Sequence, residues 1–309
     1  MTTATAPGEK PQSTRLTVLL PFAIVTLIWG STWIVIRDQL GIVPPSWSVS
    51  YRFAIAGIAM IAWALIRRDS LKLDARGWMF ACGLALAQFC LNFNFVYRAE
   101  LYITSGLVAV IFAILLVPNA ILARVFLGQR MGKQLLVGSV IAVAGIALLF
   151  VHEAREGTAS TVAVLTGIGI TLLGVLSAST ANIMQGTETS KRYPMASMLG
   201  ISMLLGTLGN ALWAWATVGP PVIEMRLGYI AGLLYLGIAA SAVAFFLYFN
   251  VIRVIGPAKA AYSGVIVPVI AMLFSTVFEG YRWSPLALGG GVLAMIGLVI
   301  ALRARRPNR

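Results

Sequence analysis

The sequence predicts an all-α integral membrane protein whose ten transmembrane helices form two inverted five-helix repeats around a central cavity. The first observation is composition: 59% of the 309 residues are hydrophobic and only 11% are charged, whereas soluble domains are about 25% charged. The second is a series of long apolar stretches, and the third is a similarity between the two halves of the chain. This composition excludes a cytosolic enzyme, a secreted disulfide scaffold and a disordered chain.

Ten apolar stretches have about the 20 residues that a helix needs to cross a bilayer core of roughly 30 Å. The first five are residues 17–36, 46–66, 78–97, 104–125 and 134–151. The second five are residues 162–185, 194–218, 227–249, 260–278 and 285–302. The first stretch is too long for a signal-peptide core, so we expect it to remain as a span. The expected domains are therefore a tail at 1–16, a first repeat at 17–151, a second repeat at 162–302 and a basic tail at 303–309.

The basic residues predict that both termini face the cytoplasm. With the N-terminus inside, 17 of the 23 Lys and Arg residues fall on the inner side of the expected topology. This bias follows the positive-inside rule. It explains the net charge of +13 without a nucleic-acid partner.

The two halves of the chain agree when they are aligned at an offset of 152 residues. Gly128 and Arg130 then meet Gly280 and Arg282 in the turn before the last span of each half. Because each half holds an odd number of spans, the second half inserts upside down relative to the first. Inverted repeats are typical of secondary transporters, whose substrate site lies near mid-membrane between the repeats. The alternative is an old duplication that now serves structure alone.

Small residues recur at helical spacing in the last span of each half. Gly138, Ala142 and Gly145 form one stripe, and the second half repeats it at residues 290, 294 and 297. Small residues let helices approach closely. We therefore expect the fifth and tenth spans to pack against each other, away from any substrate path.

An ordered set of residues resembles the EamA-type drug/metabolite transporters. Residues 29–31 read Trp-Gly-Ser in the first span, Pro44 and Pro45 lie in the loop that follows, and Arg52 lies in the second span. Within this family the chain most resembles YddG-type exporters of aromatic and other neutral amino acids. The resemblance covers most of the chain and implies an inner (plasma) membrane exporter of small neutral metabolites that works by alternating access. Gln129 and Tyr281 stand where such proteins often carry Glu.

Polar uncharged and aromatic side chains inside the spans are the candidates for binding substrate. Gln88 and Asn92 are the strongest pair, because residues four apart share one face of a helix. Amides and hydroxyls can replace the hydration of a zwitterion, and aromatic rings can stack on an apolar side chain or lie over an ammonium group. The alternative for each polar residue is a hydrogen bond that ties helices together. The expected substrate-binding residues are Trp29, Ser31, Gln88, Asn92, Phe95, Ser177, Thr180, Ser241, Phe245, Tyr248 and Tyr262.

The charged residues favour a facilitator of net-neutral solutes. All ten acidic residues fall in tails, loops or span ends, so we expect no buried carboxylate of the kind that proton-driven carriers keep in the membrane. The alternatives are a carrier that runs down the substrate gradient and one that is coupled through something other than a buried carboxylate. Arg52 could attract a substrate carboxylate, but we expect it to extend to the membrane surface instead.

The sequence lacks the residue patterns that enzymes and cofactor-binding proteins of the familiar kinds require. Cys82, Cys90 and the single histidine, His152, do not have metal-ligand spacing, and the chain has no phosphate-binding G-x-x-x-x-G-K-[ST] motif. We therefore expect no catalytic residues, no metal and no cofactor. The expected partners are a small-molecule substrate and the lipid bilayer, with the protein a monomer or homodimer. The alternatives are a carrier of a nucleotide sugar, a phosphosugar or a hydrophobic drug in the same fold, or a membrane partner protein that transports nothing.

Overall fold

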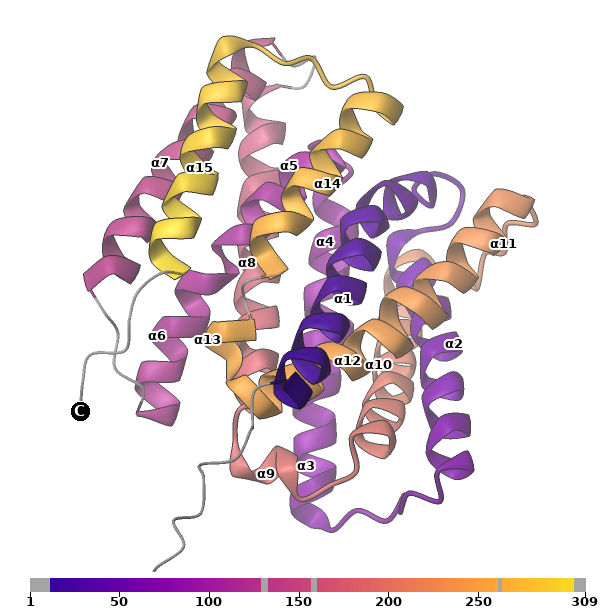
Figure 1. Cartoon of the computed structure of the whole chain (residues 1–309). Coiled ribbons are helices and arrows are strands. Elements are labelled where there is room, and N and C mark those ends of the chain that lie inside the picture. Colours follow the sequence, from indigo (N-terminus) through magenta and orange to yellow (C-terminus); the bar gives the residue numbers. More distant parts are fainter. Residues whose placement is uncertain (1–11, 129–132, 157–159, 261–262, 303–309) are drawn as a thin grey trace, which may run out of the picture.

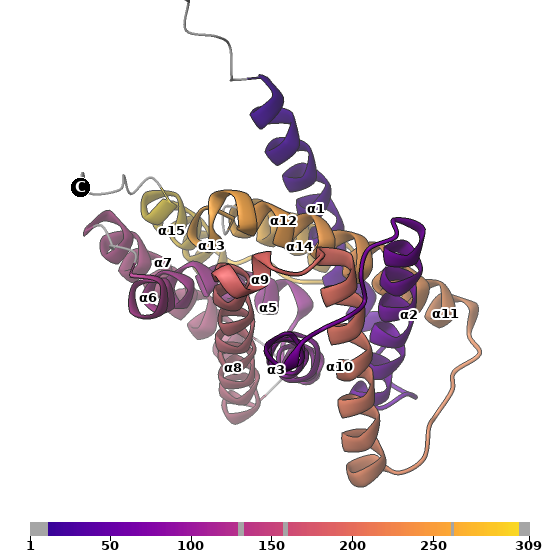
Figure 2. The ribbon, with the colours of Figure 1, turned by 90° about the horizontal axis from the view of Figure 1, so that it is seen from below.

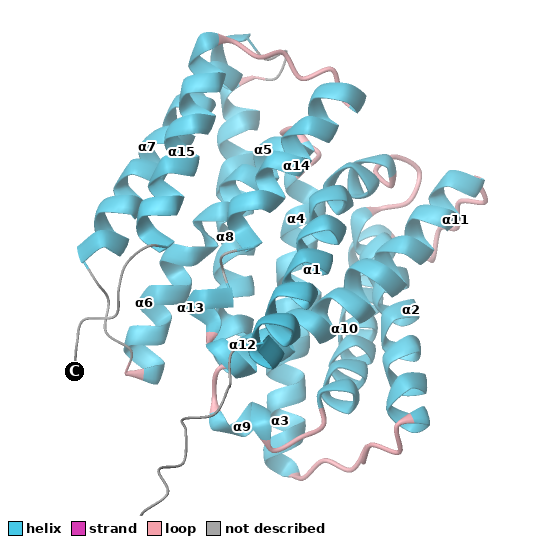
Figure 3. Ribbon diagram, in the orientation of Figure 1, coloured by secondary structure: helices cyan, strands magenta, loops and turns pink. Residues whose placement is uncertain are grey.

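The computed structural model describes residues 12–128, 133–156, 160–260 and 263–302, and every regular element in these ranges is helical (Figures 1 and 3). The helices up to residue 156 are α1 (Gln12–Asp38), α2 (Pro45–Ile66), α3 (Ala75–Leu84), η1 (Ala85–Asn92), α4 (Phe93–Ala99), α5 (Ser105–Phe112), η2 (Ala113–Leu115), α6 (Leu116–Leu127) and α7 (Lys133–Glu156). Those after residue 160 are α8 (Thr161–Gln185), α9 (Glu188–Lys191), α10 (Met195–Val218), α11 (Leu227–Leu234), η3 (Tyr235–Val243), α12 (Ala244–Ile255), α13 (Pro257–Ala260), α14 (Ser263–Phe278) and α15 (Pro285–Leu302).

Seven stretches in these ranges are long and apolar enough to cross a membrane. They are Leu19–Asp38, Pro45–Ile66, Ala75–Ala99, Ser105–Leu127, Thr161–Gln185, Met195–Val218 and Leu227–Ile255. The expected fifth, ninth and tenth spans fall on α7, α14 and α15, which contain the shorter apolar stretches Val137–Leu149, Ile266–Phe278 and Pro285–Gly297. The fold is therefore a helical membrane protein, and the count of ten spans stays a prediction.

Local sequence signals set several of the helix ends. Asp74 caps α3 by accepting a hydrogen bond from the main-chain nitrogen of Gly77 at 2.7 Å, which satisfies one donor that a helix start leaves free. Pro45 occupies the first turn of α2, where its missing N–H costs nothing. Gly128 and Gly280, the paired turn residues of the sequence, both have positive φ, at 66° and 68°. These values favour glycine over other residues.

The third long helix of each half has a π-helical segment at its centre. It is η1 between α3 and α4 in the first half, and η3 between α11 and α12 in the second. Side chains from other helices bind carbonyl oxygens of both segments. Asn210 Nδ2 donates to Phe89 O at 2.9 Å, and Trp29 Nε1 donates to Ala240 O at 3.1 Å. Because π-helical turns occur often at functional sites, these two segments mark the region to search.

Corresponding helices of the two halves pack side by side. Figures 1 and 2 show α7 beside α15 and α2 beside α10. At the first pair, a Cβ atom added to Gly145 would lie 2.6 Å from Gly290 O, and one added to Gly297 would lie 2.6 Å from Gly138 O. The expected packing of the fifth span on the tenth through small residues is confirmed.

The bundle has two ends, which we name the Asp38 end and the Tyr193 end. α1 finishes at the Asp38 end. At the Tyr193 end, Arg253 Nη1 donates to Tyr193 O at 3.3 Å, and the Tyr193 hydroxyl donates to Asp74 Oδ1 at 2.5 Å. These contacts join α12, the loop after α9 and the start of α3.

Candidate functional site

A cavity of about 120 Å³ lies among helices from both halves of the chain. Its lining comes from α1, α2, η1, α4, α5, η2, α6, α8, α12 and α14. Since one water molecule needs a cavity volume of roughly 10–15 Å³, this cavity has room for a small solute or several waters.

Aromatic rings form much of the cavity wall. Trp29 of α1 lies against Phe245 and Tyr248 of α12, with ring centres 5.3 and 4.8 Å apart. On the next turn of α1, Trp33 lies 5.4 Å from Phe112 of α5. The bond from Trp29 Nε1 to Ala240 O fixes the orientation of the Trp29 ring. Such a wall suits a solute with an apolar or aromatic part, because tilted and edge-on ring contacts are favourable.

Arg52 supplies a buried positive charge to the cavity. The residue is only 1% exposed, its Nε donates to Ser241 Oγ at 2.8 Å, and its guanidinium carbon lies 4.3 Å above the Phe93 ring. Its Nη1 has no hydrogen-bond partner among the described residues. The expectation that Arg52 extends to the membrane surface is wrong. Ser241 and Phe93 hold the side chain inward, so its charge lies at the cavity.

Two amides from η1 reach the same cavity. Gln88 and Asn92 are each 3% exposed and both line it. Within the part of the chain that the structure describes, Asn92 Oδ1 accepts no hydrogen bond. The cavity therefore contains a free cationic donor on Arg52 and a free neutral acceptor on Asn92. An unpaired buried polar group costs free energy, so both atoms favour a ligand that completes them.

The structure brings together five of the eleven expected residues, and these lie on the cavity: Trp29, Gln88, Asn92, Phe245 and Tyr248. Tyr262 lies outside the described residues. The five others do not line the cavity: Ser31, Phe95, Ser177, Thr180 and Ser241.

Three of these five residues contact other parts of the bundle. The Ser31 hydroxyl lies 2.7 Å from the Tyr235 hydroxyl. Phe95 packs on α8, where a Cβ added to Gly174 would lie 3.4 Å from Phe95 Cβ. Ser241 lies behind Arg52 and accepts its Nε–H.

The residues of α8 that line the cavity come one or two positions after the ones that the sequence predicted. Thr180 is exposed and donates to Leu176 O of its own helix at 3.0 Å, and Ser177 is half-buried beside it. The cavity face carries Ala178 and Asn182 instead. Asn182 could have been suspected as an amide within an apolar span, the same signal that identified Gln88 and Asn92. Nothing local in the sequence indicates that Arg52 turns inward.

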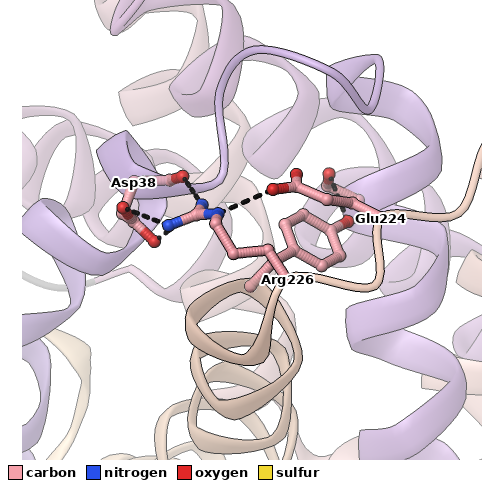
Figure 4. Close-up of polar contacts among 5 residues, drawn as sticks. Asp38, Glu224 and Arg226 are labelled. Atoms are coloured by element: carbon pink, nitrogen blue, oxygen red, sulfur yellow. Dashed lines mark hydrogen bonds and ion pairs between the residues drawn. The ribbon is translucent and has the colours of Figure 1, made fainter.

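Charged residues link several helix ends at the Asp38 end. Arg226, at the start of α11, donates from Nη1 to Asp38 Oδ1 at 3.0 Å and from Nε to Glu224 Oε1 at 2.7 Å, as Figure 4 shows. Arg37 pairs with Glu279 at 3.6 Å and donates to the main-chain oxygen of Glu100. The ends of α1, α4 and α14 and the start of α11 are thereby tied together.

Glu100 corrects the expectation that no carboxylate is buried. It follows the last residue of α4, as a span-end position should, yet it is 0% exposed. The segment after α4 folds in among the other helix ends instead of extending away from them.

A second, larger hollow of about 640 Å³ is apolar. It lies among α5, η2, α7, α14 and α15, and its lining residues include Ile146, Met272 and Val292. It meets the central cavity at Ala113 and Pro268, which line both. A lining without charged side chains suits hydrocarbon better than a polar solute.

Among the described residues, no group of three or more His, Cys, Asp or Glu side chains is arranged to hold a metal ion. The described lining of the central cavity combines the cation of Arg52, three amides and aromatic walls.

Comparison with known proteins gives a family match over both halves of the chain. The EamA-like transporter family matches residues 16–151 and 165–303. The chain is 26% identical over 294 residues to protein PagO of Salmonella typhimurium, covering 94% of each chain. It is 28% identical over 275 residues to the uncharacterized inner membrane transporter YedA of Escherichia coli, covering 87% of this chain and 86% of YedA.

Two further similarities bear on substrate and fold. The chain is 27% identical over 289 residues to a probable terminal-alkyne amino-acid exporter of Streptantibioticus cattleyicolor, covering 91% of each. A solved crystal structure matches with a TM-score of 0.70 at 19% identity, covering 95% of this chain and 100% of the other. At that identity the match shows the fold alone.

Proposed function

The chain belongs to the EamA-like transporter family, and from this premise we propose that it carries neutral amino acids, aromatic ones included, out of the cell across the inner membrane. The observation that carries the proposal is the pair of unpartnered atoms in an aromatic cavity, Arg52 Nη1 and Asn92 Oδ1. A carboxylate would complete the first and an ammonium group the second. Trp29 and Tyr248 would face the side chain.

The charges of the cavity lining argue against the other substrate classes. A phosphosugar or nucleotide sugar carries two or more negative charges, and Arg52 is the only cation among the described lining residues. A cationic drug would need a carboxylate, and the same lining contains none. An amino acid brings one charge of each sign. The similarity to a probable amino-acid exporter supports the same class.

We propose alternating access between two inverted five-helix halves as the mechanism. Figure 1 shows α2 running opposite to α10, and α7 opposite to α15. The matched π-helical segments and the positive φ of Gly128 and Gly280 support a duplicated unit. A cavity between such halves can open to one end at a time. The bias of basic residues supports a cytoplasmic position for both termini, which activity of a reporter fused to each end would test.

The test of substrate class is counterflow into liposomes loaded with unlabelled neutral amino acids. Labelled phenylalanine, tryptophan, threonine or methionine should enter saturably at equal pH on both sides. No signal for any of them, from protein shown to be folded, would reject the class.

The role of Arg52 is tested with phenylalanine and its decarboxylated analogue, phenethylamine. A hydrogen bond to a charged group contributes about 1.5–3 kcal/mol, which corresponds to roughly ten- to hundredfold in affinity. The wild type should therefore favour phenylalanine by that factor, and Arg52→Gln should lose most of the preference. Thr180→Ala, on the exposed face of α8, is the matched control. Equal competition by the two compounds in the wild type would refute carboxylate binding at Arg52.

A further inference from the structure

Glu100 is a buried carboxyl group to which the proposed function assigns no role. Its side chain is 0% exposed, and neither Oε1 nor Oε2 has a hydrogen-bond donor among the described residues. An ionised carboxylate buried without donors is costly, and such groups normally take up a proton instead. The geometry therefore favours the neutral acid in this conformation.

The neighbouring carboxylate of Glu279 has the opposite environment. Glu279 Oε2 accepts hydrogen bonds from the Ser105 and Ser275 hydroxyls at 2.7 and 2.5 Å. Its Oε1 lies 3.6 Å from Arg37 Nε. Glu279 is therefore stabilised as a charged group, and its ion-pair partner Arg37 also donates to Glu100 O.

The charged and titratable groups around Glu100 come from four elements. They are Tyr97 of α4, Arg37 of α1, Arg52 of α2 and Glu279 after α14. Burial, and then the negative charge of Glu279, raise the pKa of Glu100 well above its usual value, while Arg37 and Arg52 lower it by less. Tyr97 gives its proton to Gln39 Oε1 at 3.0 Å, so its hydroxyl does not donate to Glu100.

The position of Glu100 connects its charge to the shape of the bundle. The residue is covered where the ends of α1, α4 and α14 meet, joined by the bonds from Arg37 to Glu279 and to Glu100 O. Opening the Asp38 end would separate these helix ends and admit water to the carboxyl group. Hydration restores the ordinary acidity of a carboxylic acid.

We propose that Glu100 is a proton-binding site whose occupancy is coupled to closure of the Asp38 end. Closing this end requires that Glu100 take up a proton, and opening it lets the proton leave to the water that enters. Glu100 does not line the cavity that we assign to substrate. The proposal therefore does not depend on the identity of the substrate. It differs from the expectation of a carrier without a buried carboxylate, because pH shifts the equilibrium between the closed and open forms.

The experiment is hydrogen–deuterium exchange of the purified protein in lipid nanodiscs between pH 5 and pH 9, without substrate. Peptides that cover residues 100–105 and 275–280 report on the Asp38 end. Where Glu100 is protonated when closed and ionised when open, the opening equilibrium rises up to about tenfold per pH unit. Comparing each variant with the wild type at the same pH removes the intrinsic effect of pH on amide exchange.

Four variants make the test decisive. Glu100→Gln, a neutral isostere, should hold these peptides closed at every pH, whereas Glu100→Asp should keep the rise with pH. Glu188→Gln removes an exposed carboxylate on α9 and should behave as the wild type. The proposal is overturned if the wild type and Glu100→Gln show the same profile, or if Glu279→Gln abolishes the rise while Glu100→Gln leaves it intact.

Discussion

Replacing Gly145 by Ala should force α7 and α15 apart. The new Cβ would lie 2.6 Å from Gly290 O and 2.8 Å from Ala294 Cα, whereas ordinary van der Waals contact begins at 3.4 Å. All of these neighbours are main-chain atoms, so no side chain can rotate away and the helices must separate by most of an ångström. Overpacking of this kind costs about 1–3 kcal/mol.

Gly289→Ala is the matched control for this change. Gly289 lies on α15 next to Gly290, but a Cβ added there would meet no atom within 4 Å. In a helix, Ala is favoured over Gly by up to about 1 kcal/mol, so this variant should be as stable as the wild type or more so.

The assay is unfolding of the purified protein in mixed detergent micelles, followed by circular dichroism as denaturing detergent is added. Gly145→Ala should unfold at a lower fraction of denaturing detergent than the wild type, and Gly289→Ala should not. The counterflow rate per folded molecule should change little, because Gly145 does not line the central cavity. Equal stability of the two variants would refute close backbone packing of these helices.

Three further changes test the cavity, the Asp38 end and the Tyr193 end. Asn92→Ala should raise the KM for counterflow roughly ten- to hundredfold, because it removes a hydrogen bond to the charged ammonium group, while Thr180→Ala leaves it unchanged; equal KM values would remove Asn92 from the site. Arg226→Gln breaks the ion pair to α1 and should speed amide exchange at the Asp38 end, and unchanged exchange would show that this pair does not hold the end closed. At the Tyr193 end, the hydrogen bond from Tyr193, ahead of that from a main-chain nitrogen, lowers the pKa of Asp74. The stabilisation that ionised Asp74 gives the folded protein is fully present above the pKa that Asp74 has in the unfolded chain. It is lost as the pH falls through the lower pKa of Asp74 in the folded protein. Melting temperatures measured below about pH 4 should therefore fall less steeply for Asp74→Asn than for the wild type, and parallel curves would contradict this.

The paired glycines and small-residue stripes of the two halves could be predicted from the sequence, because they depend on local properties of the chain. Gly128 and Gly280 stand where the chain needs positive φ, and small residues recur where two backbones touch. Apolar length likewise predicts the spans, since the bilayer core has a fixed thickness. The seven longer spans end within a few residues of the predicted limits except at α12, which continues to Ile255.

The faces of the helices were decided by tertiary structure. In a soluble helix, polar residues mark the outward face, but lipid and protein interior are both apolar, so this contrast fades. Thr180 can face outward because its hydroxyl bonds to Leu176 O of its own helix. The sequence therefore favoured Thr180, while packing turned Asn182 toward the cavity.

Sequence alone determined the class of protein, the approximate spans and the amide pair at Gln88 and Asn92. Only the tertiary structure decided the environments of Arg52 and Glu100. Both stand near span ends, where a long or acidic side chain usually reaches water. Ser241 and Phe93, from distant parts of the chain, hold Arg52 inward, and the meeting of three helix ends covers Glu100. Burial of a charge depends on what packs over it, and those neighbours are distant in sequence.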